Sequence, residues 1–268
     1  MKKYLVFIFS ILLVFMVACD GQETEDIEEP HPDDGKTSAE IQEEIMAEQD
    51  DIPSEITTEV LDVKYYNWLD ESVDEETITV YAEIENTSNI SIHVDSVDVT
   101  YLDSDGSVIA VNEAYVSPGY LKEGSIGYLA TEIEDDIERF KDLDEVDIEV
   151  MAMPFTDGEV VELDVIDNKL NVDTWGEKSA KVSVTGFLKN ESDISFDEEE
   201  TNAMIGLYDK DNNFLAAELM YSDQEFSVDA GKETSFEFGG GSPLPPAVRE
   251  KTDHAEVNAI GIQNEEEY

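Results

Sequence analysis

From residue 56 onward, apolar and polar residues alternate with a period of two, which is typical of β-strands that bury one face. The clearest alternating segments are residues 77–84, 97–101, 146–150 and 181–185. Their apolar side chains fall on one side, and hydroxyls or carboxylates fall on the other, which favours antiparallel sheets with one wet face. Residues 131–140 break this pattern, because their apolar positions have helical spacing and predict a short helix or irregular crossing. The chain is therefore expected to be an all-β protein.

Five sequence blocks recur in the same order about 105 residues apart, which indicates one module used twice. The paired blocks are residues 60–63 with 162–165, 85–91 with 189–195, 100–106 with 206–212, 121–124 with 228–231, and 145–148 with 256–259. Several of them are rich in Asn, Asp, Ser and Gly, which is the chemistry of tight turns between strands. We expect two modules, residues 56–154 and 158–264. In the second, residues 239–246 predict a loop where the first has its short helix.

The second copy carries the residues of a known family motif. Ile205-Gly206-Leu207-Tyr208-Asp209 is similar to the motif that names the FxLYD domain, and Lys189-Asn190-Glu191-Ser192 fits the turn that precedes it in that family. The first copy is a looser match through residues 85–88 and 99–106. The resemblance implies two tandem immunoglobulin-like antiparallel β-sandwich modules, of a kind found in exported bacterial and archaeal proteins, often lipoproteins, generally without an assigned activity. Because these are strand and turn motifs, they support a fold rather than a function.

The N-terminus has the pattern of an export signal. Lys2 and Lys3 precede an apolar run over residues 4–17, which is shorter than the roughly 20 residues that a membrane-spanning helix needs. The only cysteine, Cys19, follows Met16-Val17-Ala18 at the end of this run. The arrangement resembles the lipobox of bacterial lipoproteins. It implies that residues 1–18 are cleaved and that Cys19 carries a covalent diacylglycerol, with palmitate as its expected kind of acyl chain. The alternative is an uncleaved signal anchor with an incidental cysteine.

Residues 19–55 are dominated by carboxylates and contain a single lysine, Lys36. Charge repulsion and sparse apolar content predict a disordered acidic tether, and a short helix over residues 38–49 is the alternative. Such a tether would place the folded part beyond the extracellular face of the membrane, through a cell-wall layer.

The negative charge of the chain excludes some classes of binding partner. The 268 residues include 67 Asp and Glu against 15 Lys and Arg, a formal net charge of -52. Phosphate backbones are repelled by such a charge, so no nucleic acid is expected as a partner. The apolar fraction of 41% is ordinary for a folded protein. The acidity is therefore interpreted as an adaptation to a saline or alkaline exterior, where dissolved salt screens repulsion between carboxylates.

The sequence contains no recognisable catalytic motif. A nucleophile elbow, a His-Glu-x-x-His pair, a phosphate-binding loop and a cysteine pair are all missing from it, and its three histidines are scattered. With so many acidic residues, neighbouring carboxylates carry no information about acid–base chemistry. We therefore expect a non-enzymatic protein with no catalytic residues.

Two groups of residues are candidates for binding. Asp209, Asp211 and Asn213 alternate as the ligands of hard cations do, which suggests either weak calcium binding or a plain hairpin turn. Trp68 and Trp175 follow the first strand of each copy and belong either to the core or to a ligand platform. No other metal site is expected.

These observations predict a surface-exposed lipoprotein, held on the bilayer by its lipid, that acts as an envelope-associated or interaction component with a cell-wall or protein partner. The alternative is an extracellular binding module that captures a cation, a peptide or a cell-wall polymer in the groove between its two modules.

Overall fold

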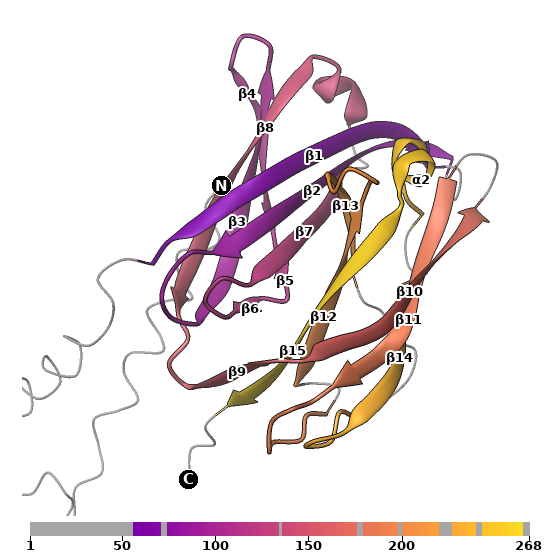
Figure 1. Cartoon of the computed structure of the whole chain (residues 1–268). Coiled ribbons are helices and arrows are strands. Elements are labelled where there is room, and N and C mark those ends of the chain that lie inside the picture. The colour runs from indigo at the N-terminus through magenta and orange to yellow at the C-terminus, as the bar shows by residue number, and fades with distance from the viewer. Residues whose placement is uncertain are drawn as a thin grey trace, which may run out of the picture. The chain divides into compact units, whose positions relative to one another are not determined.

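Antiparallel strands make up most of the residues that the computed structural model describes, namely 56–70, 74–133, 136–175, 179–197, 200–219, 227–239 and 243–264 (Figure 1). All four segments that the alternation singled out lie within strands. The predicted all-β class is confirmed. In these ranges no helix is long and apolar enough to cross a membrane.

The first half of the fold, residues 56–154, contains two sheets. One has the strand order β1-β2-β7-β5, and in the other β3 pairs with β4, β6 and β8. The bounds of these strands are β1 Thr58–Asp70, β2 Glu75–Asn86, β3 Ile92–Asp103, β4 Val108–Ala114, β5 Val116–Ser117, β6 Tyr120–Leu121, β7 Ile126–Ile133 and β8 Leu143–Pro154.

The core of this half is built by the apolar positions of the alternating strands. Ile78 and Val80 of β2 are fully buried, and they join Val97 and Val99 of β3 in one hydrophobic cluster. Each such side chain contributes roughly 1.5–3 kcal/mol when it leaves water. The apolar residues recur with a period of two because every second side chain of these strands is buried in the core.

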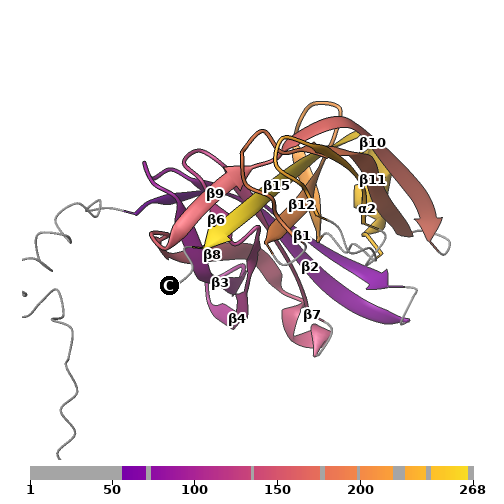
Figure 2. The same ribbon diagram turned by 90° about the horizontal axis from the view of Figure 1, so that it is seen from below.

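The second half, residues 158–264, also contains two sheets. Their strand orders are β10-β11-β14 and β13-β12-β15-β9, and β12, β15 and β9 lie side by side in both views (Figures 1 and 2). The bounds are β9 Gly158–Glu162, β10 Asp164–Trp175, β11 Ser179–Lys189, β12 Thr201–Tyr208, β13 Phe214–Leu219, β14 Glu233–Gly239 and β15 His254–Asn264.

A buried asparagine makes the same turn in both halves. Asn86 donates its side-chain amide hydrogens to the carbonyls of Ile90 and Leu121, at 2.8 and 2.9 Å. Its counterpart Asn190 donates in the same way to two carbonyls, at 2.6 and 3.1 Å. In each case the amide oxygen accepts the backbone N–H two residues on. The repeated Asn-x-Ser block thus corresponds to a repeated set of hydrogen bonds.

The aspartate-led hairpins are also duplicated. Asp103 accepts the backbone N–H groups of Asp105 and Ser107, both at 2.9 Å. Asp209 accepts those of Asp211 and Asn213, at 2.8 and 3.0 Å. Both turns close through a residue with a positive φ, 76° at Gly106 and 63° at Asn212, which Gly and Asn tolerate best.

Each half places a short helix before its last long strand. In the first half β7 ends at Ile133 and the 3-10 helix η1 spans Ile137–Phe140, so the short helix predicted within residues 131–140 is confirmed for residues 137–140, whereas residues 131–133 continue the strand. In the second half β14 ends at Gly239, and the helix α2 spans Pro246–Lys251. The sequence did not predict α2, because Pro246 was assigned to a loop although proline is well suited to the first turn of a helix.

The two halves share a buried cluster. Tyr81 and Tyr128 of the first half belong to the same hydrophobic cluster as the core of the second, and the described parts of both halves belong to a single compact unit. The division into two immunoglobulin-like modules stays a prediction. The signal peptide, Cys19 and the acidic tether lie outside the described residues.

Candidate functional site

The outer face of β1, β2 and β7 is covered by β12 and β13 of the second half. This face carries the polar positions of the alternating pattern, yet Thr79, Tyr81 and Glu83 of β2 are only 6%, 4% and 8% exposed. The expectation of one wet face is therefore wrong for β2. The reason is that its second face is occupied by another sheet rather than by water.

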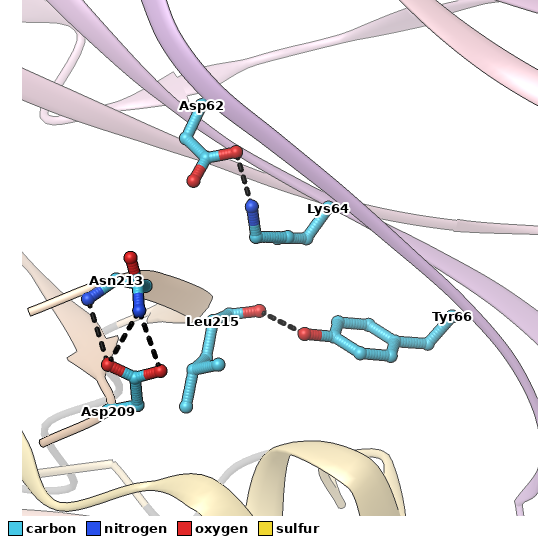
Figure 3. Close-up of polar contacts among 6 residues, drawn as sticks. All are labelled: Asp62, Lys64, Tyr66, Asp209, Asn213 and Leu215. Carbon is cyan, nitrogen blue, oxygen red and sulfur yellow. Dashed lines mark hydrogen bonds and ion pairs between the residues drawn. The ribbon is translucent and has the colours of Figure 1, made fainter. Parts of the chain in front are cut away.

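Tyr66 illustrates how the halves meet. Its hydroxyl donates to the carbonyl of Leu215 in β13 at 2.8 Å, and Figure 3 shows the ring reaching from β1 toward that carbonyl. Burial, reinforced by the charge of Asp62, raises the pKa of Tyr66 to about 12. The hydroxyl therefore stays protonated and keeps its role as a donor.

A hydrogen-bonded chain of two tyrosines and a glutamate lies at the centre of the contact. The Tyr208 hydroxyl donates to Oε1 of Glu83 at 2.5 Å, and the Tyr128 and Tyr208 hydroxyl oxygens are 3.0 Å apart. Tyr208 has one hydroxyl hydrogen, which is used on Glu83, so Tyr128 must be the donor to Tyr208. We call Glu83, Tyr128 and Tyr208 the junction triad.

The environment of the triad favours neutral phenols and penalises the carboxylate. Burial raises the pKa of Glu83 above its ordinary value, and Asp62 and Glu256 add to the rise, while the Tyr208 hydrogen bond and Lys64 oppose it. Burial also raises the pKa of Tyr128 and of Tyr208. The triad is enclosed and internally satisfied, so its chemistry is to hold two sheets together.

Close packing surrounds the triad. Phe214 stacks on Tyr128 with ring centres 6.0 Å apart, and a Cβ added at Gly206 would lie 2.6 Å from the Tyr128 ring. The missing side chain at Gly206 is what admits the Tyr128 ring against β12. The contact is therefore shaped by both halves rather than being an accidental touch of two surfaces.

A groove of about 230 Å³ lies where the two halves meet. Pro118 and Ile126 line it from the first half, and the exposed carboxylates Glu162 and Asp164 line it from the second. Beside them, the Asn258 side chain donates to the Ile126 carbonyl at 2.9 Å and ties the halves together. The groove could hold a small cationic group, because two carboxylates border a hollow that both polar and apolar residues line.

The calcium candidates form a self-satisfied turn. Asn213 donates its side-chain amide to the Asp209 carboxylate at 2.9 Å, so it presents a hydrogen rather than its oxygen (Figure 3). This bond is the main reason that the pKa of Asp209 is below its ordinary value. Within the described ranges no three His, Cys, Asp or Glu side chains are grouped as metal ligands. Calcium binding at Asp209, Asp211 and Asn213 stays a prediction.

The aromatic candidates are placed differently from each other. Trp68 is 8% exposed, and its indole N–H donates to the Thr79 hydroxyl at 2.9 Å, which leaves little of the ring accessible to a ligand. Trp175 is the last residue of β10, and its side chain lies outside what the structure describes.

Comparison with known proteins does not assign the chain to a family. No family model matches it, and no curated protein matches it either. The resemblance to FxLYD domains therefore rests on the quoted motifs alone.

Sequence reasoning missed the junction triad. The motif contains Tyr208, but nothing in the sequence indicates that Tyr128 or Glu83 lies beside it. The one available sign is that a large aromatic residue, Tyr81, stands next to Glu83 among the polar, non-core positions of its strand.

Proposed function

We propose that this protein is a non-enzymatic, lipid-anchored component of the extracellular face of the cell membrane, where it acts through interaction with other envelope components. The observation that supports the proposal is the junction triad. Its carboxylate and phenol groups are of a kind that can act in catalysis, but here they are buried and hydrogen-bond to each other, so they join the two β halves. In this view Cys19 bears the diacylglycerol, and the tether lets the body reach beyond the membrane.

We also propose that the two halves are tandem FxLYD-like, immunoglobulin-like modules. The duplicated asparagine turn and the duplicated aspartate hairpin support this, since unrelated sandwiches have no reason to repeat both sets of hydrogen bonds at equivalent positions.

The lipid anchor is tested on the full chain expressed in a bacterial host with a lipoprotein pathway. Wild-type protein should partition into the detergent phase after Triton X-114 separation, and mass spectrometry should show a diacylglycerol on Cys19. The Cys19→Ser variant should move to the aqueous phase or keep its signal peptide. Equal partition of both chains, with no added lipid mass, contradicts the proposal.

A second candidate function is favoured by the groove. Glu162 and Asp164 at its border would attract a cation or a lysine-bearing peptide. The full chain titrated with calcium chloride, and separately with the peptide Ala-Lys-Ala-amide, should bind at least one of them. The double variant Glu162→Gln, Asp164→Asn should lose that binding. The matched pair Glu233→Gln, Glu237→Gln on β14 should keep it, and an equal loss in both pairs refutes a groove site.

A further inference from the structure

The face of β12 and β13 that meets the first half is a docking surface within the chain. Gly206, Tyr208 and Ala217 lie on it, and Tyr208 and Ala217 are 4% and 1% exposed. Gly206 and Ala217 are directly opposite in the strand pairing. These small and aromatic side chains are buried only because β1, β2 and β7 cover them.

The equivalent face in the first half is exposed. Alignment of the two hairpins through Asp103 and Asp209 places Thr100 of β3 and Val111 of β4 where Gly206 and Ala217 stand, and the two pairs share the same register. Val108 and Val111 are 60% and 54% exposed. We call this surface the open face: the outward side chains of β3, β4 and β8 between residues 98–102, 108–113 and 145–153.

The open face combines an apolar strip with a group of carboxylates. Its carboxylates lie in neighbouring cross-strand rows and are Asp98, Glu113, Glu145, Asp147 and Glu149. None of the three strands contains Lys or Arg. Met151 and Met153 extend the apolar surface along β8, each 46% exposed. Such a surface is complementary to one in which positively charged side chains lie opposite the carboxylates and apolar side chains lie opposite the valines and methionines.

The charge and the apolar side chains of the open face favour one kind of partner. A second copy of this chain is a poor partner, since each copy carries a net charge of -52. An anionic lipid surface is repelled for the same reason. We propose that the open face docks a protein segment in which Lys or Arg side chains flank a short apolar strip. This proposal rests on the interaction role proposed above, but it depends neither on Cys19 nor on the groove.

The test uses a fluorescent 12-residue peptide of alternating Lys and Val and a second peptide of alternating Lys and Ser. Both carry the same charge, and the full chain in detergent is titrated against each by fluorescence anisotropy at about 0.15 M salt, where surface charges are screened beyond roughly 8 Å. The Lys–Val peptide should bind at least tenfold more tightly, because only it supplies an apolar strip.

Variants then locate the binding. The double variant Val108→Thr, Val111→Thr keeps the charge and the β-branched shape, and should lower the affinity for the Lys–Val peptide about tenfold. The double variant Asp147→Asn, Glu149→Gln should lower the affinity for both peptides, because both carry the same positive charge. The control pair Glu233→Gln, Glu237→Gln changes charge equally on β14 and should leave both affinities unchanged.

Four outcomes overturn the proposal, three in the binding and sedimentation measurements and one in NMR. One is equal affinity for the two peptides, and another is equal weakening in the open-face and control pairs, since both indicate attraction to net charge alone. The third is self-association of the wild-type chain in sedimentation that the valine variants abolish. Backbone NMR shifts on the wild-type chain give an independent location if a variant unfolds: shifts confined to β3, β4 and β8 support the proposal, and shifts elsewhere refute it. A negative result leaves the detergent-partition test of the lipid anchor unaffected.

Discussion

The junction triad gives a prediction whose size follows from its geometry. The change is Tyr208→Phe, which removes one hydroxyl and keeps the ring that packs against Phe214 and His254. The loss leaves Glu83, which is 8% exposed, without its donor at 2.5 Å. It also leaves the Tyr128 hydroxyl without its acceptor at 3.0 Å.

The expected cost is the sum of these two losses. A hydrogen bond to a charged group is worth about 1.5–3 kcal/mol, and one between neutral groups about 1 kcal/mol. Tyr208→Phe should therefore lower the free energy of unfolding by about 3 kcal/mol. Glu83→Gln keeps an acceptor for Tyr208 and removes a buried charge, so it should change stability by only about 1 kcal/mol.

The double variant measures whether the two residues act together. With Gln at position 83, the loss of the Tyr208 hydroxyl no longer strands a charge, and the coupling energy should be about 1.5 kcal/mol. Urea unfolding of the two single variants, the double variant and wild type, followed by tryptophan fluorescence at pH 7, gives this value. Tyr65→Phe is the matched control, because its hydroxyl donates to the Asp144 carbonyl at an exposed position.

The outcome that refutes the reasoning is additivity. If the costs of Glu83→Gln and Tyr208→Phe add to within about 0.5 kcal/mol, the triad is not a coupled unit. A cost of Tyr65→Phe equal to that of Tyr208→Phe would contradict the claim that burial sets the magnitude.

Four further predictions concern pH, packing, turns and salt. The pKa of Glu83 is raised above its ordinary 4.5, so its contribution to stability is present below pH 4.5 and is lost as the pH rises through the folded-state pKa; wild type should lose stability relative to Glu83→Gln in that window, and parallel pH curves from chemical denaturation would contradict this. Gly206→Ala places a methyl group against the Tyr128 ring and should cost about 1–3 kcal/mol in urea unfolding, whereas no change would mean that the ring moves freely aside. Asn86→Ala and Asn190→Ala each remove two donated hydrogen bonds and the accepted backbone N–H from a fully buried side chain, and each should cost about 2–3 kcal/mol in urea unfolding; a cost for only one of the two variants would contradict the idea that both halves use the turn for stability. The melting temperature of the full chain should rise from low to molar salt, and a flat response would exclude charge repulsion as a destabilising force.

The strands and turns could be predicted because their causes are local. Alternation places Ile78 and Val80 on one side of β2, and Asn and Asp close turns with their own side chains whatever the surroundings. The first and last blocks of the repeat are misaligned. The registers pair Glu59 with Glu85 and Asp164 with the equivalent Lys189, so Asp164 holds the place of Glu59 rather than of Asp62. The registers pair Thr100 with Asp147 and Gly206 with Glu256, so Glu256 rather than Asn258 holds the place of Asp147. Strand alternation tolerates a shift of two residues without changing which face is apolar, and sequence alone could not exclude it.

The junction could not be predicted, because it depends on what covers a face rather than on which residues form it. β2 and β8 both alternate, yet Glu83 of β2 is buried and Glu149 of β8 is exposed. In an isolated sheet, polar residues at alternate positions face water. The same residues can be buried where a second sheet covers that face and supplies hydrogen-bond donors. Tyr208 provides that donor from a position far along the chain.

The use of tyrosine at the junction is consistent with the acidity of the chain. The sequence has only 15 Lys and Arg to balance 67 carboxylates, but it has 11 Tyr. A phenol can donate to a buried carboxylate without bringing a second charge into the interior, and therefore without a second desolvation penalty. It also stays neutral here, because burial raises its pKa. The hydrogen bonds of the junction triad should accordingly be insensitive to salt, since they join two neutral phenols and one carboxylate and bring no second charge. The exposed carboxylates of the open face are accessible to ions, so the affinity of the open face for a Lys- or Arg-bearing segment should fall as salt rises. Salt dependence thus distinguishes the interaction that holds the protein together from the interaction proposed to engage its partner.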